Sequence, residues 1–177
     1  MPQPIGYVTY VSEIQLPSEK LWELLLLPET IVFLAAGRVD YPDQSGWPRQ
    51  FQEGAVFNLR PHPRGVWSLF GLLPPADHRV RVTKIDIENG VIETEEHGPL
   101  IMGWHHRMEL AANGPQSSLY TDTVRVASRN WLLTKLLVLF AERYYRHRHA
   151  RWPRLVAGVR RGRFPPSACQ ATSIEVD

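Results

Sequence analysis

His106 and Asp122 are the two side chains of this sequence whose types and positions suit acid–base chemistry. Each belongs to a stretch in which apolar residues alternate, residues 101–111 for His106 and residues 118–127 for Asp122. Alternation is typical of a strand with one face turned toward a core. A hairpin that closes through residues 112–116 places His106 opposite Asp122. The pair then lies on an otherwise apolar inner face, which in the first stretch contains Met102, Trp104, His106, Met108 and Leu110.

A carboxylate beside a buried imidazole fixes the tautomer of the ring and raises its basicity, which is what a general base needs. The same pair can instead be structural, because buried polar groups must find hydrogen-bond partners. No nucleophile or metal ligand stands near either residue in the sequence. Both interpretations stay open, and both depend on the strand register, because a shift by one residue would place the two side chains on opposite faces.

Other motifs for catalysis and metal binding are missing from the sequence. The adjacent His105 and His106 point to opposite faces of a strand, and His147 and His149 stand about 200° apart around a helix, so neither pair can share an ion. The sequence contains no HExxH, GxSxG, Walker A or GxGxxG motif. The single cysteine, Cys169, excludes an internal disulfide. We therefore expect no metal and no cofactor.

Composition indicates one globular domain. The chain has 177 residues, of which 44% are hydrophobic and 21% are charged. The first residues lack the basic and apolar regions of a secretory signal, and the longest apolar run, Leu136–Ala141, is much shorter than a membrane span. We expect a cytoplasmic protein with a domain over residues 1–157. The tail, residues 158–177, is expected to pack on that domain or on a second copy of the chain.

Positive charge is concentrated near the C-terminal end. The net charge is +2, yet residues 129–163 contain ten basic residues and one acidic residue. With its interleaved aromatic residues, this run suits an anionic membrane surface or a nucleic acid. Alternatively, it is a solvated helix face that balances the acidic remainder of the chain, and the lack of a nucleic-acid motif favours this second interpretation. The residues concerned are Arg143, Arg146, Arg148, Arg151, Arg154, Arg160, Arg161 and Arg163.

Strands and helices follow one another in a simple order along the chain. Residues 6–16 predict a first strand, a short helix follows Pro17 and ends near Leu27, and a second short helix covers Glu29–Ala36. Six short β-rich runs separated by turn residues then indicate an antiparallel meander. These runs are Ala55–Arg60, Val66–Leu72, His78–Ile87, Val91–Glu96, Ile101–Ala111 and Ser118–Ala127.

The last predicted element is a long helix over Asn130–Trp152, which we expect to end at Pro153. Its first half is apolar on nearly every side and is therefore predicted to be buried on every side. Before it, a change of apolar parity predicts a bulge near Thr83. A curved sheet with one helix across its concave face encloses a volume, and where side chains leave it unfilled it is a ligand cavity. The inner face of the helix is expected to carry Leu133, Leu137, Phe140 and Tyr144.

Several groups of residues, taken in order, match the pattern of a known superfamily. They are Leu16–Trp22, Leu73-Pro74-Pro75 with His78–Val82, His97–Leu100, Trp104-x-His106 with Tyr120-x-Asp122-x-Val124, and Phe140, Tyr145–Arg148 and Trp152. In this order they resemble the SRPBCC superfamily of START and pollen-allergen-like helix-grip proteins, and the last group resembles its bacterial polyketide-cyclase-like branch. The resemblance implies an α+β helix-grip fold. Such a fold has a curved antiparallel sheet of six to seven strands around one long C-terminal helix, with two short helices after the first strand.

The resemblance also implies a hydrophobic ligand cavity, although the second histidine that relatives often carry is Met108 here. Our first hypothesis is that a small hydrophobic or aromatic molecule binds between sheet and helix, with no reaction assigned. A second is an enzyme of the polyketide cyclase or dehydratase type that uses His106 with Asp122. A third is binding of an anionic surface or nucleic acid through the basic helix. The residues expected to contact a ligand are Trp104, Met108, Tyr120, Phe140, Tyr144, Trp67 and Phe70.

Overall fold

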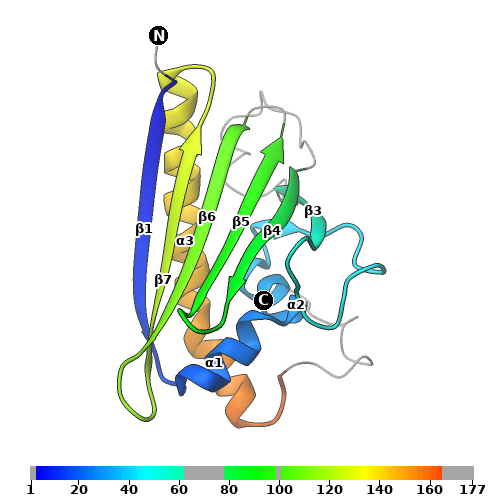
Figure 1. Cartoon of the computed structure of the whole chain (residues 1–177), viewed down its shortest axis with the longest axis vertical. Helices are drawn as coiled ribbons and strands as arrows, with labels where there is room; N and C mark the ends of the chain where they lie inside the picture. The colour runs from blue at the N-terminus through cyan, green and yellow to red at the C-terminus, as the bar shows by residue number, and fades with distance from the viewer. Residues whose placement is uncertain (1–2, 62–77, 99–100, 165–177) are drawn as a thin grey trace.

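In the part of the chain that the structure describes, seven antiparallel strands form one sheet in the order β1-β7-β6-β5-β4-β3-β2 (Figure 1). The structure is a computed structural model and describes residues 3–61, 78–98 and 101–164. Strands β1 and β2 are the two edges of the sheet. The predicted run Val66–Leu72 and Cys169 lie outside the described residues. The strands are β1 (Ile5–Ile14), β2 (Val39–Asp40), β3 (Val56–Pro61), β4 (His78–Asp86), β5 (Val91–Gly98), β6 (Ile101–Ala112) and β7 (Ser118–Ala127).

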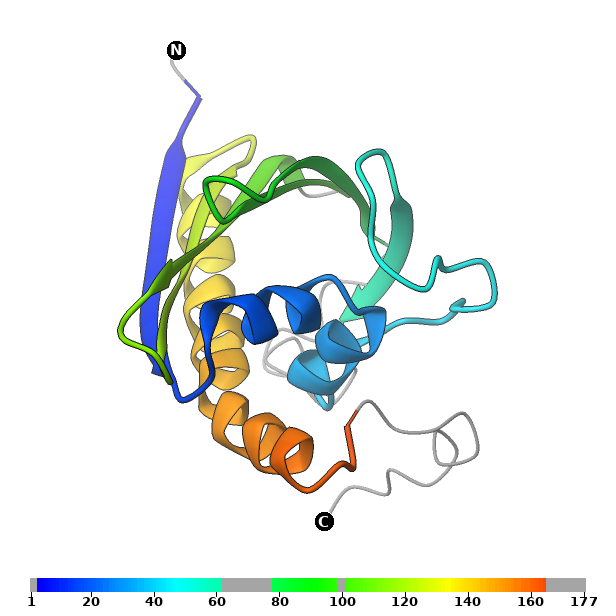
Figure 2. The ribbon, with the colours of Figure 1, turned by 60° about the horizontal axis from the view of Figure 1, so that its bottom comes forward.

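Three helices lie on the concave side of the sheet. They are α1 (Ser18–Leu25), α2 (Pro28–Ala35) and α3 (Trp131–Arg160). The long helix α3 packs along β1 and also contacts β7 and α2. Figure 2 shows the sheet curving around the helices, so that the core lies between its concave face and α3. This arrangement confirms the predicted α+β helix-grip fold.

Local sequence signals account for where elements begin and bend. The side chain of Asn130 caps α3 by accepting a hydrogen bond of 2.9 Å from the backbone N–H of Leu133. The bulge predicted near Thr83 is confirmed, because the β4–β5 register shifts between Val82 and Lys84. Because a bulge adds one residue to the strand, the apolar side chains on both sides of it can face the core although their alternation shifts by one position.

The predicted end of the long helix at Pro153 is wrong, because α3 continues to Arg160. Proline removes one backbone hydrogen bond from a helix and normally kinks or ends it. Here Pro153 is exposed, and the helix on both sides of it is held by the buried side chains of Trp152, Leu155 and Val156. Burial of these three side chains offsets the cost of one lost hydrogen bond.

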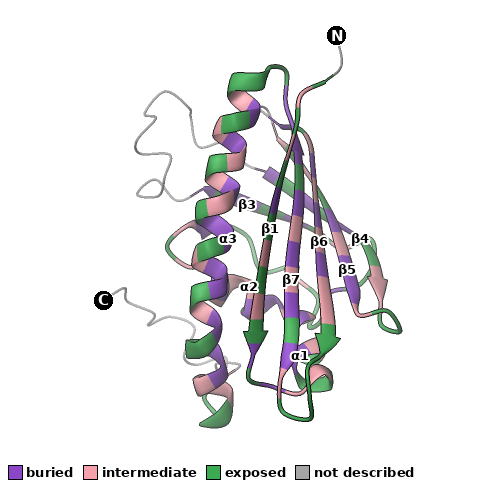
Figure 3. Cartoon of the chain, turned by 90° about the vertical axis from the view of Figure 1, so that its left-hand side faces the viewer, coloured by how far each residue is buried: buried purple, intermediate pink, exposed green. Residues whose placement is uncertain are grey.

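The first half of α3 is not buried on every side, contrary to the sequence prediction. Trp131, Leu132 and Leu139 are exposed, and Figure 3 shows alternating buried and exposed residues along the helix. The reason is that α3 runs along the side of the sheet, so only one of its faces meets β1 and β7. Of the predicted inner face, Leu137 and Tyr144 are buried. Within the described residues, no helix is long and apolar enough to cross a membrane.

Strand β6 departs from the predicted alternation at its start. Met102 is exposed, and Ile101 is buried in its place. The β5–β6 register shifts between Glu96 and Gly98, which reverses the parity at this end of the sheet. From Trp104 onward the predicted inner face of β6 is confirmed.

Candidate functional site

His106 and Asp122 make the predicted contact, but through a different strand register. Asp122 pairs with Met108 and His106 pairs with Val124, so the pairing is displaced by two residues from the predicted one. The reason is the position of the turn, which covers residues 113–117 and not the predicted 112–116, and a turn displaced by one residue moves the pairing by two. A displacement of two residues leaves each side chain on its predicted face and makes His106 and Asp122 diagonal neighbours. The Nε2 atom of His106 lies 2.6 Å from Oδ1 of Asp122.

Asp122 is the centre of a buried polar cluster. It is 1% exposed, and its carboxylate accepts three hydrogen bonds. Nε2 of His106 and the hydroxyl of Tyr120 donate to Oδ1 at 2.6 and 2.7 Å, and Nε2 of His149 donates to Oδ2 at 3.1 Å. Both oxygens of the buried carboxylate are therefore paired, which is the condition for keeping a charge inside a protein.

Arg148 supplies the positive charge that balances Asp122. Its guanidinium is buried, lies 5.2 Å from the ring centre of Tyr145, and donates to the hydroxyl of Tyr120 at 3.4 Å. Burial by itself would raise the pKa of Asp122. The charge of Arg148 and the hydrogen bonds from His106 and His149 instead hold that pKa well below its ordinary value of 3.8. Asp122 is therefore ionised at neutral pH.

The hydrogen bonds define the tautomers of both histidines. A carboxylate only accepts hydrogen bonds, so His106 and His149 must each carry the proton on Nε2. Nδ1 of His149 then accepts a hydrogen bond of 2.7 Å from the hydroxyl of Ser12 on β1. Burial lowers the pKa of His106 below its ordinary value of 6.5, although Asp122 acts in the opposite direction. His106 is therefore a neutral ring whose Nδ1 is the basic nitrogen.

This cluster is not arranged as a metal site. Both imidazoles direct a proton, and not a lone pair, toward Asp122. Among the residues that the structure describes, no three His, Cys, Asp or Glu side chains could hold a metal ion together. The contacts that the cluster makes are hydrogen bonds, and its imidazole, carboxylate and phenol groups can hold or transfer protons.

The sequence pattern missed His149 and misplaced Arg148. Arg148 was expected on a solvated face, but it is buried, and Arg151 is half-buried and donates to the backbone carbonyl of Phe33. The helical period could have predicted their burial. Arg148 and His149 follow Tyr144 and Tyr145 by four residues, so they lie on the same buried face of the helix. The remaining members of the predicted basic run are exposed: Arg143, Arg146, Arg154, Arg160, Arg161 and Arg163.

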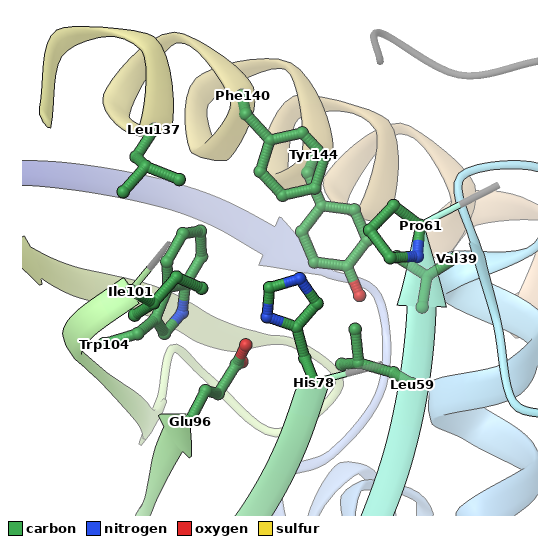
Figure 4. A pocket seen from close by; sticks show the side chains of 10 residues that line it. All are labelled: Val39, Leu59, Pro61, His78, Glu96, Ile101, Trp104, Leu137, Phe140 and Tyr144. Carbon is green, nitrogen blue, oxygen red and sulfur yellow. The ribbon is translucent and has the colours of Figure 1, made fainter. Parts of the chain in front are cut away.

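Described residues line two adjoining cavities between the sheet and α3. The first has a volume of about 20 Å³, and Figure 4 shows Trp104 and Phe140 on one side of it and His78 and Glu96 on the other. The second, of about 30 Å³, is lined among others by His106, Met108, Tyr145 and Arg148, and it shares Leu59, Glu96 and Tyr144 with the first. Each has room for one or two water molecules, because aromatic side chains fill most of the space around them.

Glu96 is an acidic residue at the centre of this region that the sequence pattern also missed. It follows Ile92 and Thr94 on the inner parity of β5, so alternation could have revealed it. Burial raises its pKa to about 8, although the nearby Arg148 acts in the opposite direction. At neutral pH the side chain is therefore a neutral carboxylic acid, which can donate a hydrogen bond. No hydrogen bond to the Glu96 side chain is present among the described residues.

The residues predicted to contact a ligand fall into three groups. Trp104, Phe140 and Tyr144 line the first cavity, and Met108 and Tyr144 line the second. Tyr120 lines neither of the two and is buried beside Asp122. Two further residues, Trp67 and Phe70, lie outside the described residues. Met108 stands where relatives often carry a second histidine. In this chain the cluster still contains a second histidine, because α3 supplies His149.

No protein-family model matches the sequence, and no curated protein matches it. Solved structures do resemble the fold. An aromatase/cyclase from Streptomyces has a TM-score of 0.65 and 14% identity, covering 93% of this chain and 99% of that chain. Norcoclaurine synthase from Thalictrum flavum has a TM-score of 0.62 and 9% identity, covering 86% of this chain and 92% of that chain.

A START superfamily protein from Mycobacterium smegmatis has a TM-score of 0.57 and 13% identity, covering 84% of this chain and 98% of that chain. At such low identity the likeness establishes the fold and leaves the activity open. It agrees with the motif order in the sequence and with the sheet gripping one long helix. The chain therefore has the helix-grip fold that these solved structures share.

Proposed function

We propose that the protein binds a small hydrophobic or aromatic molecule in the two adjoining cavities between the sheet and α3. One observation carries the proposal: two polar groups that find no hydrogen-bond partner among the described residues face an otherwise apolar, aromatic space. The indole N–H of Trp104 is buried and unpaired, and Glu96 lies directly across the β5–β6 ladder from it. Both residues line the first cavity (Figure 4). Apolar walls with a few convergent polar groups are typical of small-molecule sites.

The unpaired indole gives the site a reason to take up a ligand with one polar atom. A buried donor without an acceptor costs about 1–3 kcal/mol, which a ligand oxygen or a bound water relieves. A solved structure of norcoclaurine synthase, with a TM-score of 0.54 to this chain, is a complex with dopamine and hydroxybenzaldehyde. A protein with a similar fold therefore binds small aromatic molecules. Both points support a ligand that is mainly aromatic and carries one oxygen toward Trp104 and Glu96.

Phe140 is the side chain that must move to admit such a ligand. The first cavity holds only about 20 Å³, less than an aromatic ring requires. Phe140 is half-buried at its rim and stacks on the ring of Tyr144 at a centroid distance of 5.9 Å. Turning Phe140 outward frees the volume of one ring, and the ligand then replaces it in the stack against Tyr144.

The test is binding of the fluorescent apolar probe N-phenylnaphthylamine to the wild-type protein and two variants. Phe140→Ala should tighten binding about fivefold or more, because it removes the ring that fills the cavity. Leu139→Ala is the matched control, since Leu139 is exposed beside Phe140 and should leave binding unchanged. Mass spectrometry of the purified protein under non-denaturing conditions should also detect a bound small molecule. Failure of both the wild type and Phe140→Ala to bind the probe would contradict the proposal.

A second candidate function is an enzyme of the cyclase or dehydratase type, with His106 as general base and Asp122 as its orienting partner. The specific observation that favours it is the tautomer of His106, which leaves Nδ1 basic on a ring that borders the second cavity. Abstraction of a proton next to a ligand carbonyl is the step that such a base can perform. Ionised Asp122 would stabilise the resulting imidazolium.

His106→Gln tests this candidate, because it keeps a polar side chain at that position while removing the base. Turnover of a polyketone or hydroxyketone substrate should fall by about a hundredfold or more, and probe binding should persist. Circular dichroism checks that the variant is folded. Turnover that survives in His106→Gln would exclude His106 as the base, and the ligand-binding proposal would remain.

A further inference from the structure

A groove outside the core runs between the end of β1 and the C-terminal half of α3. Its volume is about 490 Å³, which is in the range of ligand and peptide sites. Two contacts bound it. At one end the hydroxyl of Ser12 bonds to His149 at 2.7 Å, and at the other end Arg160 donates to the backbone carbonyl of Gln15 at 2.9 Å. Figure 3 shows this side of the molecule, with α3 beside the free edge of β1.

The walls of the groove combine an apolar floor with positive charge at one end. Ile14, Trp152 and Val156 form the floor and are almost fully buried. The indole N–H of Trp152 has no hydrogen-bond acceptor. Arg160 and Arg161 stand at the end of the groove and are exposed, in a segment that contains ten of the 20 Lys and Arg residues of the chain and one acidic residue.

The strand side of the groove is an unpaired sheet edge. Among residues 3–61, 78–98 and 101–164, β1 pairs with β7 alone, so alternate N–H and C=O groups along its other edge have no partner strand in this part of the chain. One residue beyond the end of β1, the carbonyl of Gln15 accepts a hydrogen bond from the side chain of Arg160. Residues 12–15, at the end of β1 and just after it, line one side of the groove. The other side is lined by residues that recur at helical spacing along α3 and just after it: His149, Trp152, Pro153, Val156, Ala157, Arg160 and Arg161.

We propose that this groove is a docking site for an acidic peptide segment in extended conformation, which adds to the free edge of β1 as an eighth strand. Addition to an edge beside a helix gives affinity through backbone hydrogen bonds and specificity through alternate side chains. One set of peptide side chains would contact the floor at Trp152 and Val156. Acidic side chains at the far end would pair with Arg160 and Arg161, and Arg160 would give up the carbonyl of Gln15 to a peptide N–H.

The dimensions of the groove fit a short segment. From His149 to Arg160 the helix rises about 16 Å, which corresponds to about five residues of an extended strand. The free backbone groups of the strand edge and the two neighbouring arginines favour an acidic peptide. A small amphiphile could contact the apolar floor and the arginines, but it could not form hydrogen bonds with the backbone of β1.

The experiment measures fluorescence anisotropy of a labelled, acetylated and amidated hexapeptide in which valine and glutamate alternate. The double variant Arg160→Glu/Arg161→Glu should weaken binding about tenfold or more, and binding by the wild type should also fall as salt rises. Arg154→Glu is the matched control, because Arg154 is exposed on the same helix and does not line the groove. The control should change affinity by less than about twofold.

Two further ligands separate strand addition from other modes of binding. A hexapeptide of the same sequence with N-methylated backbone amides should not bind, because it cannot donate to the strand edge. Octanoate tests the small-amphiphile alternative. In nuclear magnetic resonance spectra the valine–glutamate peptide should shift the indole N–H signal of Trp152 and the backbone N–H signals of residues 12–15. The proposal is overturned if the N-methylated peptide binds as well, or if octanoate shifts these signals while the unmodified peptide does not.

Discussion

Glu96 should make the protein less stable as the pH rises, which is the reverse of the usual behaviour of a carboxyl group. Burial raises its pKa from the ordinary 4.5 to about 8. Between these two values the folded state keeps a proton that the unfolded state has lost. The stability associated with neutral Glu96 is therefore fully present below pH 4.5 and is lost as the pH rises through 8.

The size of the effect follows from the two pKa values and from the surroundings of Glu96. One pKa unit corresponds to about 1.4 kcal/mol, so the interval from 4.5 to about 8 sets an upper limit of about 5 kcal/mol. Glu96 lines two small cavities whose walls are mostly apolar and aromatic, which keeps the cost of its charge high. Between about pH 5 and about pH 9 we therefore expect about 4 kcal/mol, equivalent to about 8–16 °C in Tm for a chain of this length.

Urea unfolding of the wild type and Glu96→Gln at about pH 5 and pH 9 measures the effect. The amide cannot ionise, so Glu96→Gln should lose about 4 kcal/mol less stability than the wild type over this interval. Glu95→Gln is the matched control: Glu95 is exposed next to Glu96 and faces the opposite side of β5, so this change should leave the pH dependence as in the wild type. The other titratable groups around Glu96, which are His78, Tyr144 and Arg148, are unchanged in both variants, so their titration contributes equally to all three curves.

The reasoning would be refuted by parallel stability curves for the wild type and Glu96→Gln from pH 5 to pH 9. Glu96 would then be ionised in the folded protein at neutral pH. In that case it could not donate a hydrogen bond to a ligand oxygen, and the polar end of the proposed cavity would favour a cationic ligand group.

Three other perturbations test the cluster and the packing of α3. Asp122→Asn should lower the free energy of unfolding by about 3–5 kcal/mol because it leaves Arg148 buried without a counter-charge, and a double-mutant cycle with Arg148→Met should recover part of this loss. ¹⁵N chemical shifts should show His106 neutral with its proton on Nε2 at pH 6.5, and a titration midpoint above that value would contradict the buried environment. Gly6→Ala should cost about 1–3 kcal/mol in thermal unfolding because its Cβ would overlap Cγ2 of Val138, and Val138→Ala should restore most of the loss.

Most of the fold could be predicted because strands and helices carry different apolar periods. Alternation located β1, β4, β6 and β7, and the change from period two to a helical period located α3. The same signal fixes which face a residue occupies but not its partner. The His106–Asp122 contact was therefore predicted correctly while the register was wrong by two residues, since alternation is unchanged by a shift of two.

The end of α3 and the position of Arg148 could not be predicted, because both depend on distant contacts. A proline normally ends a helix, and only the burial of Leu155 and Val156 explains why α3 passes Pro153. An arginine in a basic run is normally solvated. Arg148 can be buried only because Asp122, on a strand far away in the sequence, compensates its charge.

The charge balance of the interior restricts what the cavities can bind. Arg148 and Asp122 compensate each other, His106 is neutral, and Glu96 is neutral as long as it keeps its proton. An anionic ligand group would find no free cation among these four, because Arg148 is already balanced by Asp122. A cationic group would require Glu96 to ionise, which becomes favourable only as the pH approaches 8. At neutral pH the arrangement therefore favours an uncharged molecule, held by stacking against Tyr144 and by hydrogen bonds to one oxygen.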